Sequence, residues 1–463
     1  MDAINSQGED VPAAARRHRV VIIGSGFGGL TAAQQLEDAD VDVTLVAMTG
    51  HHLFQPLLYQ VATGILSVGE IAPSTRLVLR DQKNVTVTLG EVDQIDVAAR
   101  TVHAQAGHVD FTLEYDSLIV AAGANQSYFG NDHFERWAPG MKTIDDALEL
   151  RGRILGSFEL AELTEDPEER RKLLTFVVVG GGPTGVEMAG QIGELANRTL
   201  KNSFRRIDPA EARIILLDAA PGLLPPFGEK LGKAAQKRLE ELGVEVMLNA
   251  MVTDVDATGV EVKEEDGTTH RITTACKIWS AGVQASPLGK MIADQTEAEV
   301  DRAGRVQVTK DLSVPGHPEI FVIGDMMSLD KLPGVSPVAI QGAKHVAKHI
   351  TREVAGKQTP ADRPPFKYFD KGSMATVSRY SAVVKMGGIE FHGFFAWVMW
   401  LLVHLAFLIG FRNRLATLFS WGMHIVGDHR SHLSSTARFV YGRRAIDRVY
   451  GEEIPRSRID PTS

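Results

Sequence analysis

The chain of 463 residues is poor in cysteine and carries no excess of positive charge. Its one cysteine, Cys276, excludes an internal disulfide framework, a Cys-x-x-Cys redox pair and a cysteine zinc cluster, and no metal site is expected. The formal net charge of −9 argues against general binding of nucleic acid. Residues 1–19 contain no long apolar run, so we expect no secretory signal peptide. The composition, 44% hydrophobic and 23% charged, is that of a packed globular protein with roughly two to four domains.

Glycine, in contrast, is abundant, and two glycine-rich segments each follow a short β-branched run. Residues 24–29 (GSGFGG) follow Val20–Ile23, and residues 180–185 (GGGPTG) follow Phe176–Val179. Each segment precedes residues of helical propensity. The first glycine of such a loop allows a tight turn, the second lets a pyrophosphate approach the backbone, and the third lets helix and strand pack closely. One such match is weak, because a chain with 44 glycines yields about 0.4 by chance, but two in the same context indicate dinucleotide binding.

The two loops begin 156 residues apart, at Gly24 and Gly180, which indicates a duplicated unit rather than a short repeat. A second strand follows each loop, at 41–46 and at 213–217. Residues 115–124 also resemble residues 276–283. A further apolar strand, Ile320–Ile323, ends in Gly324-Asp325 without a glycine loop of its own, so we expect it to return and complete the first sheet. The prediction is an α/β protein with two Rossmann-like domains.

The acidic residue after the second strand distinguishes the two units. Asp218 could accept hydrogen bonds from a ribose 2′-hydroxyl and would repel a 2′-phosphate, which favours NADH over NADPH in the second unit; a solvated strand-end aspartate is the alternative. The first unit has Ala47 at this place. Two nucleotide sites suggest a hydride relay from NADH to a flavin. The first unit is the better flavin site, with Asp325 facing ribityl or phosphate groups, unless it is simply a turn aspartate.

Several segments together resemble the type II NADH dehydrogenases, within the glutathione-reductase-like flavoproteins that have two dinucleotide-binding domains. The resemblance runs from about residue 19 to about residue 427. Besides the glycine loops it rests on Ala121-Ala-Gly123, Ser280-Ala-Gly282, Phe321–Asp325, His52–Gln60, Gly181–Glu187, Ala339-Ile-Gln341 and Lys371–Ala375. Two departures are Ala47 and Ser336-Pro337, the latter standing where the family commonly has a glutamine. The lone cysteine separates the chain from the disulfide reductases of the same superfamily.

The resemblance implies a non-proton-pumping NADH:quinone oxidoreductase with bound FAD. It implies a membrane quinone (menaquinone or ubiquinone) as acceptor, a homodimer, and attachment as a peripheral or monotopic protein to the cytoplasmic face of the inner membrane. The expected domains are 19–145 and 296–375 for FAD, 146–295 for NADH, and 376–463 for membrane anchoring and dimerisation. The expected cofactor-binding residues are Gly24, Ser25, Gly26, Phe27, Gly28, Gly29, Gln55, Pro56, Ala122, Gly123, Gly324 and Asp325 for FAD, and Gly180, Gly182, Pro183, Thr184, Gly185, Asp218, Ala281 and Gly282 for NADH, with Glu187, Gln341 and Lys371 beside them.

Three of these residues have catalytic roles implied by the resemblance. Glu187 would carry a proton where nicotinamide, flavin and quinone meet, with a pKa raised by burial; a helix-N-terminal glutamate stabilised by the dipole is the alternative. Gln341 would offer its amide to a quinone oxygen, or is an ordinary helical glutamine. Lys371 would stabilise negative charge on the flavin, or is a surface lysine in a turn. Gln55-Pro56 would pack against the flavin ring, or form a bend.

The segment 391–411 has 21 residues without Asp, Glu, Lys or Arg, and a second apolar stretch covers residues 415–426. The length permits a membrane span, a buried core or dimer-contact helix, or a helix lying in the membrane interface. Its tryptophans, the arginines that follow, and the resemblance favour an in-plane anchor. From residue 412 to the end there are nine Arg and five acids, a charge of +4 suited to anionic lipid.

Shorter patterns and other functions complete the expectations. Thr143 and Asp146 predict a capping box before a helix at 144–163, and the charged run 164–172 is interpreted as a solvated connector. Two further functions stay open from the residues alone. One is a soluble NADH-dependent flavin reductase acting on a small redox protein, and the other is a flavin-bearing signalling or scaffold protein.

Overall fold

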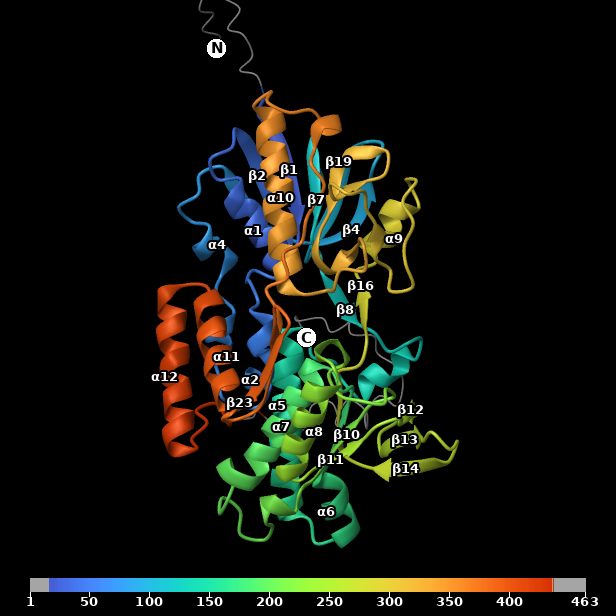
Figure 1. The fold of residues 1–463 in the computed structure, drawn as a ribbon, viewed down its shortest axis with the longest axis vertical. Coiled ribbons are helices and arrows are strands. Elements are labelled where there is room, and N and C mark those ends of the chain that lie inside the picture. The colour runs from blue at the N-terminus through green and yellow to red at the C-terminus, as the bar shows by residue number, and fades with distance from the viewer. Residues whose placement is uncertain (1–15, 435, 437–463) are drawn as a thin grey trace, which may run out of the picture. The chain divides into compact units, whose positions relative to one another are not determined.

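The computed structural model describes residues 16–434 and 436 (Figure 1). Its residues group into two compact units, each built from three separate stretches of the chain. The first unit comprises Met1–His52, Ser74–Ala124 and Gln284–Phe369. The second unit comprises Leu53–Pro73, Asn125–Val283 and Asp370–Ser463. Residues 53–73 lie in the second unit, where α2 (Leu58–Ala62) packs against helices of that unit. Residues 125–145 also belong to the second unit.

The first unit is organised around a six-stranded sheet in the order β18-β19-β7-β1-β2-β3. The predicted return of the chain is confirmed: β19 pairs in parallel with β7, with Ile320 opposite Leu118 and Val322 opposite Val120. Buried apolar residues fill both faces of the central strands, as parallel strands require. The strands of this unit are β1 (His18–Ile23), β2 (Val41–Ala47), β3 (Val85–Leu89), β4 (Glu91–Asp96), β5 (Thr101–Ala106), β6 (Val109–Glu114), β7 (Ser117–Val120), β17 (Val306–Gln307), β18 (Ser313–Val314), β19 (His317–Val322) and β20 (Met327–Ser328).

Two helices of the first unit, α1 (Phe27–Gln35) and α10 (Ser336–Val354), pack against each other (Figure 1). The predicted helix after the first loop is confirmed, but it begins at Phe27, inside the glycine segment, so that Gly28 and Gly29 belong to its first turn. Pro337 lies in the first turn of α10, where its missing N–H costs no helical bond. The remaining helices of this unit are α4 (Thr75–Val78) and α9 (Leu288–Ala293).

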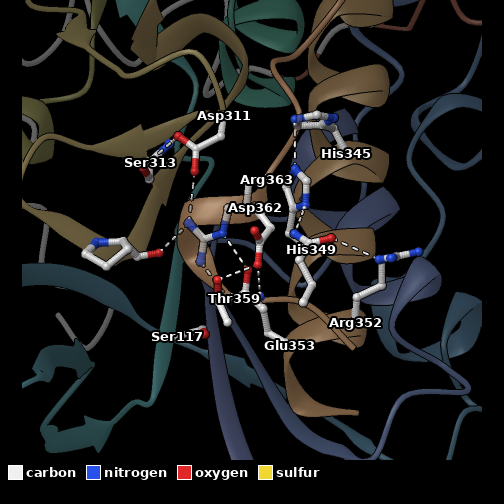
Figure 2. A network of polar contacts seen from close by, with 12 residues as sticks. Ser117, Asp311, Ser313, His345, His349, Arg352, Glu353, Thr359, Asp362 and Arg363 are labelled. Atoms are coloured by element: carbon white, nitrogen blue, oxygen red, sulfur yellow. Dashed lines mark hydrogen bonds and ion pairs between the residues drawn. The ribbon is translucent and has the colours of Figure 1, made fainter. Parts of the chain in front are cut away.

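A buried polar network fixes the segment that follows α10 (Figure 2). The side chain of Arg363 is only 2% exposed and pairs with Glu353 at 2.5 Å and with Asp311 at 3.0 Å. Its guanidinium also lies 4.7 Å from the ring centre of Phe321 in β19. Arg363 thus links Glu353 at the end of α10 with Asp311 and with Phe321 in β19. These contacts, together with the pairing of β19, hold the third stretch of the first unit to its sheet.

The second unit has a four-stranded parallel sheet in the order β11-β10-β9-β15. It repeats the arrangement around β1, as the predicted duplication requires. The strands of this unit are β9 (Thr175–Val179), β10 (Arg213–Leu217), β11 (Val244–Met247), β12 (Met251–Val255), β13 (Gly259–Lys263), β14 (Thr269–Thr273), β15 (Cys276–Trp279), β21 (Ser373–Ser378), β22 (Ser381–Met386) and β23 (Ile389–Gly393). A two-stranded ladder of β8 (Ala124–Gln126) and β16 (Val283–Ala285) lies where the chain passes between units.

The predicted helix α5 (Ile144–Leu163) is confirmed with its capping box of Thr143 and Asp146. Residues 164–172 connect α5 to β9 and none of them is buried, as expected of a solvated connector, but residues 167–172 belong to a helix that was not predicted, α6 (Pro167–Leu173). Asp166 caps this helix through the N–H of Glu168, and ion pairs three residues apart run along its exposed side. The other α-helices of the second unit that precede residue 370 are α2, α3 (Val68–Ile71), α7 (Pro183–Glu194) and α8 (Glu229–Glu241).

The apolar C-terminal segment forms two neighbouring helices, α11 (Phe394–Phe407) and α12 (Phe411–Gly427) (Figure 1). The run 391–411 is therefore not one continuous helix: its first residues belong to β23, and Gly410 interrupts it with φ +90°. At about 1.5 Å per residue, the 14 residues of α11 extend about 21 Å, short of the roughly 30 Å bilayer core. Within residues 16–434 and 436, no helix has the length and apolarity needed to cross a membrane.

Candidate functional site

The first glycine loop connects β1 to α1 at the carboxyl edge of its sheet. Gly24 has φ +102° and donates its N–H to the Val46 carbonyl at 2.8 Å. A Cβ on Gly29 would overlap the carbonyl oxygen of Gly24. Two of the three predicted glycine functions, the tight turn and the close packing, are therefore visible within the protein itself.

Gly26, the middle glycine, is different because nothing in the protein demands a glycine there. Its φ is −69°, which any residue adopts, and a Cβ built on it meets no atom within 4 Å. It stands at the N-cap of α1, where free N–H groups and the helix dipole favour an anion. The open space in front of Gly26 is thus a cradle that the methyl group of an alanine would fill, and it fits the pyrophosphate of a dinucleotide.

His51 and His52 form hydrogen bonds with Ser25 of the first loop, and we call these contacts the histidine clasp. The Ser25 hydroxyl donates to the His51 carbonyl at 3.0 Å, and Nδ1 of His52 lies 2.9 Å from the Ser25 carbonyl. The His52 ring meets Phe27 edge-on at 5.0 Å. Burial lowers the pKa of His52, and its Nε2 is buried with no hydrogen-bond partner among the described residues. Sequence reasoning used His52 only as the start of a motif, and no pattern marked its contact with the loop.

The other predicted FAD residues of the first unit lie at the ends of neighbouring strands. Ala122 and Gly123 follow β7, which pairs with β1, and Gly123 has φ +71° with open space around its Cα. Gly324 and Asp325 follow β19, the next strand in the sheet. Strand order therefore brings these segments to the edge that carries the first loop, as expected for a ligand site of an α/β sheet. Gly28 packs against Ile323, which lies at the same edge. A Cβ added to Gly28 would lie 3.1 Å from Cδ1 of Ile323.

The second loop repeats this geometry in the second unit. Gly180 has φ +110°, and a Cβ on Gly185 would overlap the Gly180 carbonyl oxygen. Gly182 has φ −71°, caps α7 and, like Gly26, faces open space. Pro183 and Thr184 form the first turn of α7. Gly182 therefore also leaves open space beside the N-terminus of its helix, and this space fits the pyrophosphate of a dinucleotide.

Asp218 follows β10 and faces the loop. Its Oδ2 accepts the N–H of Gly181 and its Oδ1 accepts the N–H of Ala220 at 2.6 Å. Ala281 and Gly282 follow β15 on the other side of β9. The loop thus lies between Asp218 and the Ala281-Gly282 segment, which is the order that a dinucleotide needs along the edge of a sheet.

Glu187 lies in α7, one turn beyond the loop, and is buried. Burial raises the pKa of its carboxyl group well above the usual value, although a hydrogen bond with the Thr376 backbone opposes this shift. Burial also raises the pKa of the Tyr59 phenol, to which the Glu187 carboxyl group lies close enough to contribute. A carboxyl group whose pKa is raised by burial is the type of group that the predicted proton carrier requires.

A small cavity of the second unit lies beside these groups, with a volume of about 30 Å³. Three side-chain nitrogens of its lining, Trp400 Nε1, Arg379 Nε and His424 Nδ1, are buried with no partner among the described residues. The volume accommodates water and not a quinone ring. The remaining lining residues are Tyr59, Gln60, Ile65, Gln191, Thr376, Ser378, Trp397, Leu401, Trp421 and Ile425. Sequence analysis missed this cavity because its residues come from five separate segments.

The remaining predicted residues are placed as follows. Both ends of the Gln341 amide bind the backbone of Phe369, with Nε2 donating at 2.9 Å and Oε1 accepting at 3.0 Å. Gln341 therefore holds the last residue of the first unit. The Lys371 ammonium lies 5.6 Å from the ring centre of Phe407. Gln55-Pro56 begin a short 3₁₀-helix of the second unit, which agrees with a bend.

The two C-terminal helices pack against the second unit with buried tryptophans and polar contacts, and they also expose many large apolar side chains. Trp421 donates to Gln60 Oε1 at 2.7 Å and Ser420 donates to Glu70 Oε1 at 2.6 Å. Buried Arg430, just after α12, donates to the Thr63 carbonyl at 2.8 Å. The same two helices expose ten large apolar residues: Phe394, Phe395, Leu402, Phe407, Phe411, Leu415, Leu418, Phe419, Met423 and Val426. We call these ten residues the apolar face; such a patch marks an interaction surface.

Comparison with known proteins defines the class. Residues 18–343 match the pyridine nucleotide-disulphide oxidoreductase family. The fold is that of NDH2 from Plasmodium falciparum in complex with NADH, with a TM-score of 0.82, 21% identity, and coverage of 89% of this chain and 99% of that one. It also resembles the sulfide:quinone oxidoreductase of Aquifex aeolicus, with a TM-score of 0.67, 19% identity, and coverage of 89% and 96%.

Two curated relatives narrow this class. The type II NADH:quinone oxidoreductase Ndh of Mycobacterium tuberculosis is 61% identical over 447 residues, covering 96% of each chain. NdhA of the same organism, also a type II NADH:quinone oxidoreductase, is 61% identical over 428 residues, covering 92% of this chain and 91% of its own. The chain belongs to the type II NADH:quinone oxidoreductases, which confirms the resemblance drawn from its motifs.

Proposed function

We propose that this protein transfers a hydride from NADH to bound FAD and then two electrons to a membrane quinone, without pumping protons. The observation that carries the proposal is the pair of middle glycines, Gly26 and Gly182. Each has an ordinary φ and open space in front of its Cα. Two such cradles in one chain of this family need two dinucleotides, one as resident cofactor and one as substrate.

FAD is assigned to the first unit. The support is the open cradle at Gly26, the edge formed by Gly123 and Gly324, and the buried, unpartnered Nε2 of His52. When bound, FAD supplies a ring that accepts a hydride from NADH and gives electrons singly or in pairs to a quinone. The residues of this chain hold its pyrophosphate at the α1 N-terminus, where the backbone N–H groups are free.

NADH is assigned to the second unit. Gly182 leaves room for its pyrophosphate, and the carboxylate of Asp218 is held at the end of β10 by two backbone N–H groups. These bonds use one lone pair on each oxygen, so lone pairs are left for a ribose 2′-hydroxyl. A 2′-phosphate would meet a fixed negative charge, which disfavours NADPH.

Three side chains are assigned to proton and charge handling. Glu187 exchanges a proton with the quinone, supported by its burial and raised pKa. Gln341 keeps its second Nε2–H beyond the bond to Phe369, and this N–H is the donor proposed for a quinone oxygen. The exposed ammonium of Lys371 offsets negative charge that develops during transfer.

Membrane attachment is assigned to the apolar face of α11 and α12. Ten exposed apolar side chains on two packed helices suit a surface that lies in the membrane interface, while polar contacts of α12 hold this helix to the second unit. The basic tail after residue 436 lies outside the described residues. The homodimer, the cytoplasmic face of the inner membrane and the choice of menaquinone or ubiquinone follow from the resemblance and stay predictions.

The proposal is tested by following the visible flavin spectrum of the anaerobic protein. NADH should bleach it, and a quinone should restore it. Glu187→Gln keeps the shape and removes the titrating group, so stopped flow should show little change in bleaching and slower restoration, by about 10²-fold. Gln341→Ala should slow the same step. If bleaching collapses while restoration keeps the wild-type rate, both residues serve the nicotinamide side instead; absence of flavin from the purified protein would refute the function itself.

A further inference from the structure

Phe129 stands at the carboxyl edge of the second sheet with its ring directed at Gly282. The ideal Cβ position of Gly282 lies only 2.5 Å from Cζ of Phe129, so the tip of the ring covers this glycine. The rest of the ring is in solvent, and the residue is 67% exposed. A large apolar side chain in this position has no core to fill.

The backbone of Phe129 is strained. Its φ is +54°, a left-handed conformation that is a genuine outlier for a bulky residue. The neighbouring Tyr128 is buried and donates its hydroxyl to the Ala138 carbonyl at 3.0 Å. Phe129 alone is therefore turned outward. Strain of this kind persists where surrounding structure enforces it and is concentrated at ligand-binding sites.

Polar contacts tie the Phe129 turn to the segment that it covers. Gln126 Nε2 donates to the carbonyls of Ala281 at 2.7 Å and Gly282 at 2.6 Å, and the Ser127 hydroxyl accepts the Phe129 N–H at 3.3 Å. The Ser127 carbonyl accepts the indole N–H of Trp279 at 2.9 Å. The backbone turn that carries the ring is thus tied by hydrogen bonds to Ala281-Gly282 and does not belong to a loose surface loop.

Strand order indicates which half of the nucleotide Phe129 would meet. In the order β10-β9-β15, Asp218 follows the first strand, the glycine loop follows the second, and Gly282 follows the third. With the adenosine ribose at Asp218 and the pyrophosphate at Gly182, the nicotinamide half extends past the end of β15. Phe129 is the exposed aromatic residue that covers this end.

We propose that Phe129 is a positioning residue for NADH, whose ring packs against the nicotinamide half of the dinucleotide and orients it. The inference rests on the proposed NADH site of the second unit. An aromatic ring offers broad apolar contact and costs little entropy to fix, since it has two side-chain torsions. The strained backbone then has a function, because it keeps the ring at the edge before the substrate arrives.

The test measures binding of NAD⁺ and of ADP to the oxidised, flavin-loaded protein by calorimetry. Phe129→Ala should weaken NAD⁺ about tenfold, equivalent to about 1.4 kcal/mol, and leave ADP unchanged, because ADP lacks the nicotinamide riboside. Phe129→Tyr keeps the ring and should bind NAD⁺ as the wild type does. Phe129→Gly removes both the ring and the strain, and should show the same loss as alanine without a lower thermal midpoint. Leu163→Ala, an exposed apolar residue of α5, is the matched control.

Two results would overturn the inference. One is an unchanged NAD⁺ affinity in the alanine and glycine variants. The other is an equal loss for NAD⁺ and ADP, which would assign the effect to a distorted edge instead of the nicotinamide half. The Asp218→Ala variant distinguishes a wrong role for Phe129 from a wrong NADH site. If this variant leaves the affinities for both NAD⁺ and ADP unchanged, the proposed NADH site itself is wrong.

Discussion

Replacing Gly26 by alanine should remove FAD and leave the protein folded. The new methyl group meets no protein atom within 4 Å, and φ of −69° is ordinary for alanine. Removing a glycine stabilises by about 0.4–1 kcal/mol through the unfolded chain. Alanine is a poorer N-cap residue by a similar amount, about 0.5–1 kcal/mol. These effects nearly cancel, so the apoprotein should keep its stability to within about 1 kcal/mol.

The same methyl group occupies the space proposed for the pyrophosphate. A phosphate oxygen must come to about 2.9 Å from a backbone N–H, and the added carbon keeps it away. A hundredfold loss of affinity removes about 2.7 kcal/mol of the stabilisation that saturating FAD gives. Gly29→Ala is the contrasting variant: its Cβ would overlap the Gly24 carbonyl, so the loop itself should be disrupted and apoprotein stability should fall by about 1–3 kcal/mol.

The assay is the flavin-to-protein absorbance ratio of the purified variants, followed by thermal unfolding with and without added FAD. We expect Gly26→Ala to lose flavin and to lose the stabilisation by FAD, while its apoprotein unfolds as the wild type does. Gly26→Val, with a larger side chain, should contain no flavin. Purification of Gly26→Val with full flavin content would refute the assignment of this loop.

Three further predictions concern other parts of the site. Wild-type kcat/KM should be higher for NADH than for NADPH, and Asp218→Asn should lower the ratio of the two values about tenfold. Equal kcat/KM for the two nucleotides in the wild type would contradict the role of Asp218. Serine at Phe395, Phe411 and Phe419, which are 80%, 75% and 71% exposed, should reduce binding to lipid vesicles without lowering the thermal midpoint; unchanged binding excludes the apolar face as the anchor. Burial raises the pKa of Glu187, so the folded chain binds this proton more tightly than the unfolded chain and the free energy of unfolding should fall as pH rises above 4.5. Denaturant titrations should show that Glu187→Gln removes this part of the pH dependence. Identical pH profiles for the variant and the wild type would contradict the prediction.

Features encoded by neighbouring residues were predictable from the sequence. The glycine loops follow from fixed spacing after a β-branched run, and α5 follows from its capping box and apolar period. The return of β19 was also predicted, because an apolar strand ending in Gly324-Asp325 had no loop of its own. For the loops and α5 a short stretch of chain contains the physical reason for the structure, whereas the return of β19 was inferred from the order of the elements along the chain.

Features made by distant residues were not predictable in this way. The clasp of His52 on Ser25 joins residues 27 positions apart, and the cavity beside Glu187 joins α2, α7, β21, α11 and α12. Helix α6 was missed because a charged run reads as solvated chain, although its ion pairs at three-residue spacing stabilise a helix. Gly410 shows the limit for apolar runs: hydropathy gave the length of the segment and not its interruption.

The pairing of β19 with β7 has a consequence for synthesis of the chain. Ser117 begins β7 and His317 begins β19, so 200 residues separate the starts of two neighbouring strands. At about 5–20 residues per second, a ribosome needs roughly 10–40 s to deliver the second strand after the first. During this interval the apolar edge of β7 lacks its partner and can pair with other chains. Slower translation prolongs this exposure, so the yield of folded protein should depend on chaperone capacity more than on the stability of the finished fold.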